Sequence, residues 1–209
     1  MSATYVGKFW AVTSFVASIA TAIGFYFPYW IRGYYVPPYG DENFPMYFGT
    51  FRRCSYLRLT SDKFVELVDG CGRYSNFEDI PSIWWQITTI TVGTGVCISL
   101  VLSLTGLIAL CITDVVTTNI ARVAGLLQMA AGLLIGGGVA IYPNGWSSAE
   151  VRQACGGFSS PYVLGECSLC WAFYVTCVGG AAILLCATLT CHAFYQKHDH
   201  YRHVLVSYV

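Results

Sequence analysis

Residues 80–113 read IPSIWWQITTITVGTGVCISLVLSLTGLIALCIT, a stretch without a charged side chain between Asp79 and Asp114. A helix needs about 20 consecutive, mostly apolar residues to cross the hydrocarbon core of a bilayer. The stretch is long enough, and in lipid a helix pairs every backbone polar group within one segment. It therefore predicts a transmembrane helix near residues 82–112.

Three more gaps in the charge pattern have the same character. They lie between Lys8 and Arg32, between Arg122 and Glu150, and between Glu166 and Lys197. These gaps predict helices near 8–29, 122–142 and 169–195. Composition agrees, because 56% of the residues are hydrophobic and 11% are charged, against about 25% charged in a soluble domain. We expect one tetraspan domain over residues 1–209, mainly α-helical. The first gap also has the form of a signal-peptide core, but its apolar run continues to Trp30, which favours an uncleaved helix.

Four helices place loops 30–81 and 143–168 on one side of the membrane, and both termini, with a tail over 196–209, on the other. Four of the ten cysteines lie in these loops: Cys54, Cys71, Cys155 and Cys167. Disulfides persist in oxidising compartments, so paired loop cysteines predict extracellular or lumenal loops and cytoplasmic termini. A count of basic residues alone favours the inverse orientation, because the first loop is rich in arginine.

Loop 30–81 has the signals of a folded unit. Aromatic and β-prone residues predict a strand over 46–56, and apolar residues at helical spacing predict a short helix over 61–68. Residues 71–74 predict a returning strand. We expect a small sheet that a disulfide within the loop holds together.

Loop 143–168 begins with the turn dipeptide Asn144-Gly145. Ser147 followed by Glu150 has the form of a capping box, in which each side chain satisfies a free backbone N–H at a helix start. This pattern predicts a short helix over 151–154 that leads to Cys155. A disulfide from Cys155 to Cys167 would then stabilise the loop by roughly 3 kcal/mol.

Cys167 has a second candidate partner in Cys170. A Cys-x-x-Cys pair lowers the pKa of a thiol and suits disulfide exchange. The alternative hypothesis is therefore a membrane thiol oxidoreductase that uses Cys167 and Cys170.

Residues in both loops resemble known signatures. Trp30, then Gly49-Thr50-Phe51-x-x-Cys54 and a second cysteine, resemble the W…GLW…C…C signature of the claudin superfamily, with Phe51 in place of the usual Trp. The second loop and the start of the last helix resemble the lipoma HMGIC fusion partner-like tetraspan family at Pro143, Gly145, Trp146 and Trp171. The resemblance implies a claudin-like fold, which is a left-handed four-transmembrane-helix bundle with a small extracellular antiparallel β-sheet. It also implies an auxiliary or adaptor role toward membrane channels, receptors or adhesion proteins.

The leading hypothesis is a non-enzymatic adaptor or auxiliary subunit in the plasma membrane. It would bind another integral membrane protein through the sheet and a lipid-facing helix, and support that partner's assembly, trafficking or gating. A claudin-like junctional barrier protein and the thiol oxidoreductase stay open as alternatives. The net charge of zero does not favour nucleic acid as a partner, and we expect neither a metal nor a cofactor.

Several residues are candidates for further contacts. Arg52 and Arg53 are candidates either for a partner contact or for a salt bridge within the sheet. Gln128 is expected to hydrogen-bond a neighbouring helix, and small residues at four-residue spacing are expected to pack inside the bundle.

The cytoplasmic side carries two candidate signals. Cys111 and Cys191 lie at helix ends, where reversible palmitoylation occurs. The chain ends in Ser207, Tyr208 and Val209, a pattern that PDZ domains capture through the terminal carboxylate and the apolar last side chain. A cytoplasmic PDZ protein is thus a second candidate partner.

Overall fold

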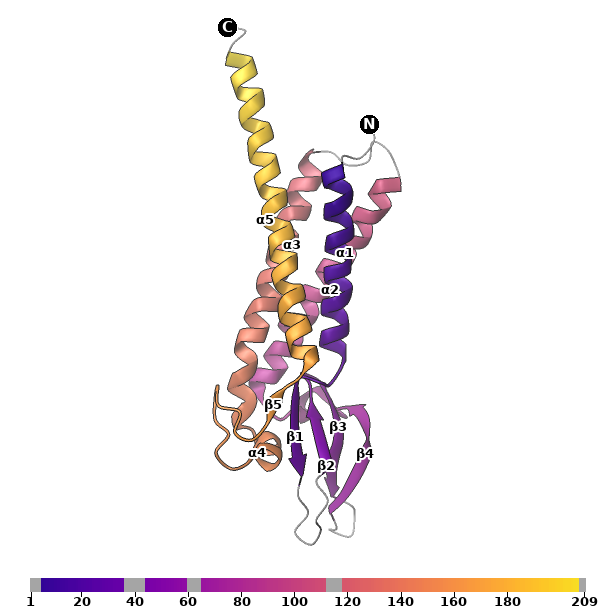
Figure 1. Cartoon of the computed structure of the whole chain (residues 1–209), viewed down its shortest axis with the longest axis vertical. Coiled ribbons are helices and arrows are strands. Elements are labelled where there is room, and N and C mark those ends of the chain that lie inside the picture. The colour runs from indigo at the N-terminus through magenta and orange to yellow at the C-terminus, as the bar shows by residue number, and fades with distance from the viewer. Residues whose placement is uncertain (1–4, 36–43, 60–64, 112–117, 207–209) are drawn as a thin grey trace.

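The computed structural model describes residues 5–35, 44–59, 65–111 and 118–206, with side chains at 8–35, 44–56, 68–110 and 120–189. It is an elongated helical bundle with a small sheet at one end (Figure 1). The first helix begins, and the last helix ends, at the end of the bundle opposite to the sheet.

Within the described residues, four helices are long and apolar enough to cross a membrane. They are α1 (Tyr5–Tyr26), α2 (Ile83–Cys111), α3 (Thr118–Ile141) and α5 (Trp171–Val206). The helices pack in a ring, with α2 and α5 each contacting both α1 and α3. The protein is therefore a multi-pass membrane protein.

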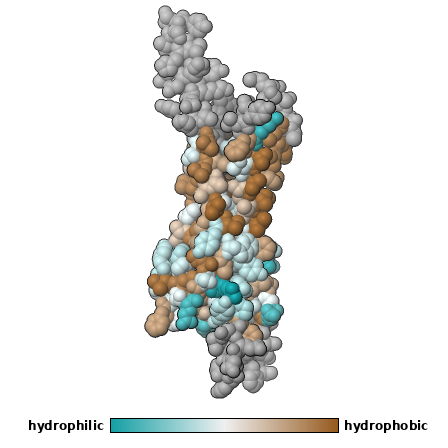
Figure 2. All heavy atoms as spheres, viewed as in Figure 1, coloured by the Kyte–Doolittle hydropathy of each residue, from teal (hydrophilic) through white to brown (hydrophobic). Residues whose placement is uncertain are grey.

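The bundle exposes large apolar side chains on its outside and buries polar ones, together with an apolar cluster, between the helices. On α1, the side chains of Phe9 and Val16 are 70% and 59% exposed, whereas Ser14 and Ser18 are fully buried. Figure 2 shows the hydrophobic residues along the outside of the helices. A membrane bundle has this distribution because lipid covers the apolar surface while polar side chains find partners between the helices.

Contacts between helices confirm the expected role of Gln128, whose Nε2 donates a hydrogen bond from α3 to Ser14 Oγ of α1. Small residues also allow close packing: a Cβ added at Gly132 would lie 2.6 Å from the Leu184 side chain. At Gly136, four residues further along α3, an added Cβ would meet nothing within 4 Å. The small residues at four-residue spacing on α3 thus serve internal packing only in part.

The strands in the described part of the chain form a five-stranded antiparallel sheet in the order β4-β3-β2-β1-β5. Their bounds are β1 Ile31–Tyr35, β2 Phe44–Phe48, β3 Arg52–Leu59, β4 Val65–Arg73 and β5 Ser168–Leu169. The last strand comes from the second loop and pairs with the first, so the sheet joins both loops. The helix bundle with its sheet agrees with the claudin-like fold expected from the sequence.

The predicted helix over 61–68 is wrong where the structure describes it. Val65–Val68 lie in β4, and Val65 and Leu67 pair with Leu59 and Leu57 of β3. The apolar spacing fitted a helix, but backbone pairing with a strand that precedes it in sequence determines the conformation. The rest of that segment, 61–64, lies outside the described residues.

The predicted strand over 46–56 is instead two strands joined by a tight turn. The Gly49 N–H donates to the Arg52 carbonyl at 2.8 Å, which closes the turn between β2 and β3. Gly49 lies so close to the segment that follows α1 that an added Cβ would sit 2.9 Å from Pro28 Cα. The glycine therefore permits the close approach of the turn to the segment between α1 and β1.

Helix α5 continues to Val206, whereas the sequence predicted a helix end at 195 and a tail over 196–209. Residues 181–206 contain neither Gly nor Pro, so no residue there interrupts a helix. Polar composition alone did not end it.

Short helices complete the sheet end: η1 (Phe77–Asp79), η2 (Tyr142–Ser147) and α4 (Ala149–Cys155). Helix α4 contains the predicted segment 151–154. It packs against β1, and Gly33 of β1 makes room for it, since a Cβ there would lie 2.9 Å from the Ala154 side chain.

Candidate interaction surface

Three aromatic side chains join the sheet to the bundle. Trp85 of α2 and Tyr142 of η2 stack with ring centroids 5.0 Å apart, and Trp30 meets Tyr142 edge-on at 4.7 Å. All three are fully buried. Trp30 Nε1 donates to the Gly24 carbonyl at 2.8 Å, and Trp85 Nε1 donates to the Tyr142 carbonyl at 3.2 Å. The two tryptophan rings thus have polar partners that fix their orientation, whereas the Tyr142 hydroxyl is buried without a hydrogen-bond partner.

Most of the signature residues support this junction and are not free for a partner. Trp30, Pro143, Gly145 and Trp146 are buried there. A Cβ added at Gly145 would lie 2.3 Å from the Trp85 ring. Phe51, which stands where claudins have Trp, packs against Phe25 with centroids 5.0 Å apart.

Trp171 differs from the other signature residues because its side chain is 46% exposed. It begins α5 and packs against Phe27 and Tyr29, with ring centroids 5.7 and 5.9 Å away. Aromatic rings at the ends of membrane spans sit well at the level of the headgroups. Together with Tyr26, these rings mark the level at which the bundle leaves the membrane.

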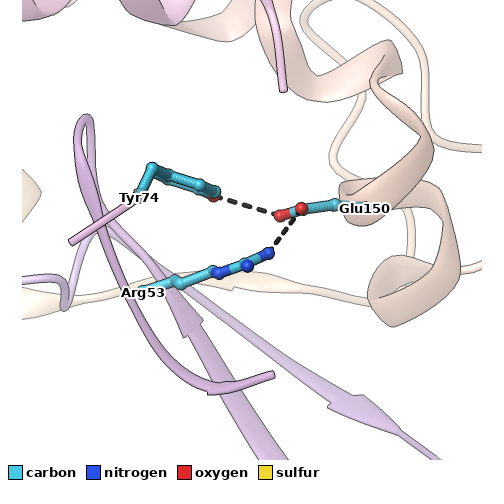
Figure 3. Close-up of polar contacts among 3 residues, drawn as sticks. All are labelled: Arg53, Tyr74 and Glu150. Atoms are coloured by element: carbon cyan, nitrogen blue, oxygen red, sulfur yellow. Dashed lines mark hydrogen bonds and ion pairs between the residues drawn. The ribbon is translucent and has the colours of Figure 1, made fainter. Parts of the chain in front are cut away.

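A cluster of three polar side chains connects the sheet to α4 (Figure 3). Arg53 Nη1 of β3 lies 2.5 Å from Glu150 Oε1 of α4. The hydroxyl of Tyr74, just after β4, donates to Glu150 Oε2 at 3.0 Å. The Arg53 guanidinium also stacks on Tyr74 and Tyr56, 4.6 and 4.1 Å from the ring centroids. Burial raises the pKa of Tyr74 well above its usual value, and the Glu150 charge raises it further, so the hydroxyl keeps its proton.

The predicted capping box is wrong. Ser148, not Ser147, is the N-cap of α4, and its side chain makes no capping hydrogen bond. Ser147 Oγ instead donates to the Asn144 carbonyl at 3.4 Å. Glu150 turns toward Arg53 and Tyr74, because a charge-assisted pair with arginine is stronger than a bond to one backbone N–H.

Disulfides connect Cys54 with Cys71 and Cys155 with Cys167. Cys170 is half-buried and forms no disulfide. Burial raises the pKa of its thiol, while Arg32 lowers it to a smaller degree. A thiol that exchanges disulfides usually has a lowered pKa, so this environment does not favour the oxidoreductase alternative.

The loop after α4 presents an exposed aromatic side chain that the sequence reasoning missed. Phe158 is 91% exposed between Gly156-Gly157 and Ser159-Ser160. The only signal for it was an aromatic residue among turn-forming residues, outside any periodic pattern. Tyr162 and Val163 of the same loop are 62% and 53% exposed.

This loop is held by contacts on both sides of Phe158. Ser159 Oγ lies within 3.3 Å of the Cys155, Gly156 and Leu164 carbonyls. Gly165 has a φ of 70°, and a Cβ there would lie 2.3 Å from the Cys155 carbonyl oxygen, so only glycine fits. The Tyr162 hydroxyl donates to the Ala140 carbonyl of α3 at 2.9 Å. Phe158 is therefore an exposed side chain on a loop that is held in position by its contacts.

Arg52 and Arg53 have different surroundings. Arg53 points toward α4, where it is paired with Glu150. Arg52 points to the other face of the sheet, where its guanidinium carbon lies 4.4 Å from the centroid of the Tyr26 ring. Its Nε is buried without a hydrogen-bond partner.

Metal binding finds no support among the described residues, where no group of three or more His, Cys, Asp and Glu side chains could hold an ion. The PDZ-ligand prediction at Ser207, Tyr208 and Val209 lies outside the described residues. The side chains of Cys111 and Cys191 also lie outside the described part, so palmitoylation stays a prediction.

Four apolar helices with an antiparallel, disulfide-linked sheet at one end define a tetraspan membrane protein of claudin-like fold. Over residues 6–195 the chain matches the family model described as lipoma HMGIC fusion partner-like protein, and it belongs to that family. It is 32% identical to LHFPL tetraspan subfamily member 2 protein of Homo sapiens over 88% of this chain and 85% of the relative. It is 33% identical to LHFPL tetraspan subfamily member 5 protein of Gallus gallus over 86% of this chain and 75% of the relative.

Proposed function

We propose that this tetraspan protein is a non-enzymatic adaptor or auxiliary subunit of the plasma membrane. It binds another integral membrane protein, of the channel, receptor or adhesion class, and supports that partner's assembly, trafficking or gating. The sheet end is extracellular and both termini are cytoplasmic, since disulfides persist in oxidising compartments.

The observation that carries the proposal is Phe158 on its fixed loop. A large apolar side chain that is 91% exposed gains free energy when a partner covers it. Because the loop is already held, covering it costs little further ordering. Aromatic residues of this kind are enriched at the centres of protein interfaces.

Crosslinking from position 158 tests the proposal. A photoreactive phenylalanine analogue replaces Phe158 in the full chain, which is expressed in cells of its native tissue and irradiated before extraction in mild detergent. We expect one stoichiometric crosslink to an integral membrane protein. Phe158→Ser should lower recovery of the same protein about tenfold, as loss of a central aromatic contact does.

Phe77→Ser provides the matched control. Phe77 is also an exposed aromatic at the sheet end, 46% exposed, and its replacement should leave recovery unchanged. Crosslinks only to lipid would contradict the proposal. Crosslinks only to a second copy of this chain would favour the junctional barrier alternative instead.

The cytoplasmic end adds a second proposed contact. Ser207, Tyr208 and Val209 form a ligand for a PDZ domain, and Cys111 and Cys191 are sites of palmitoylation. Deletion of Val209 would abolish PDZ binding, because the apolar last side chain is lost and the terminal carboxylate moves to Tyr208.

A further inference from the structure

The face of the sheet opposite to α4 places two arginines side by side, and among the described residues neither has an ion pair with a carboxylate. Arg52 of β3 is the direct cross-strand partner of Arg73 of β4. Like charges in directly opposite positions destabilise an antiparallel pair. Among the described residues, the salt bridge present is Arg53–Glu150 on the other face, and Arg52 Nε is buried without a partner. The pair therefore lacks an anion.

The position of Arg52 relative to the membrane follows from its neighbours. Its guanidinium lies over the ring of Tyr26, the last residue of the first candidate span. Two residues earlier, the Thr50 carbonyl accepts a hydrogen bond from Thr89 Oγ1 at 3.1 Å. Thr89 lies inside the second span, Ile83–Leu110. The turn that carries Arg52 is thus inserted at the level where α1 and α2 meet the edge of the hydrocarbon region.

The anions at that level of a bilayer are the phosphates of the lipid headgroups, which lie between the hydrocarbon core and water. The planar fork of arginine matches a phosphate with two parallel hydrogen bonds. The exposed ring of Tyr26, 53% exposed, lies at the same level and suits the interface between headgroups and acyl chains.

We propose that Arg52 and Arg73 together bind the phosphate of a phospholipid in the leaflet on the sheet side, with the acyl chains lying along the outside of α1 and α2. The lipid supplies the negative charge that the pair lacks. Because side chains alternate along a strand, this site lies on the face of the sheet away from Arg53 and Glu150 of α4. It does not rest on the adaptor function.

Native mass spectrometry of the purified full chain in detergent tests the site. The probe is dioleoyl phosphatidylglycerol, and dioleoylglycerol, which lacks the phosphate, is the matched lipid. We expect one phosphatidylglycerol to bind more tightly than the rest, and its affinity to fall about tenfold for Arg52→Gln and further for Arg52→Gln with Arg73→Gln, as lost charge-assisted hydrogen bonds imply. Arg152→Gln, an exposed arginine on α4, should change nothing.

Variants are compared only if both disulfides form and the protein elutes as one species. Arg52→Lys keeps the charge without the fork and should bind about threefold more weakly than wild type, so it provides the comparison if the glutamine variants do not fold. Unchanged binding in the folded variants, or equal binding of dioleoylglycerol, overturns the proposal. Displacement by inorganic phosphate at the lipid's own concentration would assign the site to a soluble anion. Loss of a co-purifying protein with lipid binding unchanged would assign the face to a protein contact and equally overturn the proposal.

Discussion

Two neighbouring arginines, Arg52 and Arg53, have opposite electrostatic environments on the two faces of the sheet. On the face toward α4, Arg53 has a carboxylate, and two tyrosine rings cover its guanidinium. On the other face, Arg52 lies opposite Arg73 and over Tyr26, with an N–H left unsatisfied. Because side chains alternate along a strand, these two successive arginines lie on opposite faces. The charge of Arg53 is paired within the protein, and the charge of Arg52 is available to a ligand.

Removal of Glu150 should have the largest effect on stability. We expect Glu150→Ala to lower the free energy of unfolding by about 2 kcal/mol, because it leaves the Arg53 charge and the Tyr74 hydroxyl without a partner. The pair is partly exposed, with 21% and 31% of the side chains accessible, so the loss stays below that of a fully buried pair. Unfolding followed by tryptophan fluorescence in one detergent measures it. Glu166→Ala, on an exposed carboxylate of the same loop, is the control, and equal losses in the two variants would refute the role of the ion pair.

Arg53→Gln and Arg52→Gln should differ in the absence of phospholipid. Arg53→Gln is expected to lose about 1.5 kcal/mol, because it removes the charged partner of Glu150. Arg52→Gln should change stability by less than about 0.5 kcal/mol, or raise it slightly, because it relieves repulsion from Arg73. The same unfolding assay in delipidated detergent compares them. Similar losses would mean that the two faces do not differ as the contacts indicate.

Tyr74→Phe should lose about 1 kcal/mol at neutral pH, the value of one hydrogen bond to a charged group that is partly exposed. The raised pKa of Tyr74 adds a pH dependence. Above its ordinary pKa near 10 the unfolded chain releases the phenolic proton while the folded chain retains it, so the wild type loses stability as pH rises from there toward the folded pKa. The variant lacks this loss, and the difference between the two proteins should shrink above pH 10. Unfolding at pH 8 and pH 11 checks it, and a constant difference would contradict the assigned environment.

Elements that depend on composition were predictable from the sequence. The membrane spans follow from charge-free runs, because no other backbone form satisfies its polar groups in lipid. The short helix at 151–154 followed from a local pattern too, although the cap assigned to it was wrong. Glu150 had a stronger partner in Arg53, which is distant in sequence, and local pattern cannot reveal such a contact.

Elements that depend on pairing were predicted only in part, as a small sheet with a strand that returns at Cys71. Residues 65–68 have helical spacing but form a strand, because β3 offers them backbone partners. Residues 46–56 divide into two strands because Gly49 allows a turn that lies against Pro28, just after α1. Similarly, the exposure of Phe158 had only a weak signal in the sequence, an aromatic residue among turn-forming residues, and no local pattern showed that Arg53 pairs with Glu150 while Arg52 does not.

By itself, the sequence determined that this is a tetraspan membrane protein with a cysteine-bearing loop unit, since hydrophobic length and charge placement act locally and suffice for membrane insertion. Tertiary structure alone decided which charges are satisfied. Arg53 pairs with Glu150 because α4 packs against its face of the sheet. Arg52 has no such carboxylate, because its side chain lies on the opposite face, near the membrane boundary. The physical reason is that ion pairing depends on distances of a few ångströms between residues that are far apart along the chain.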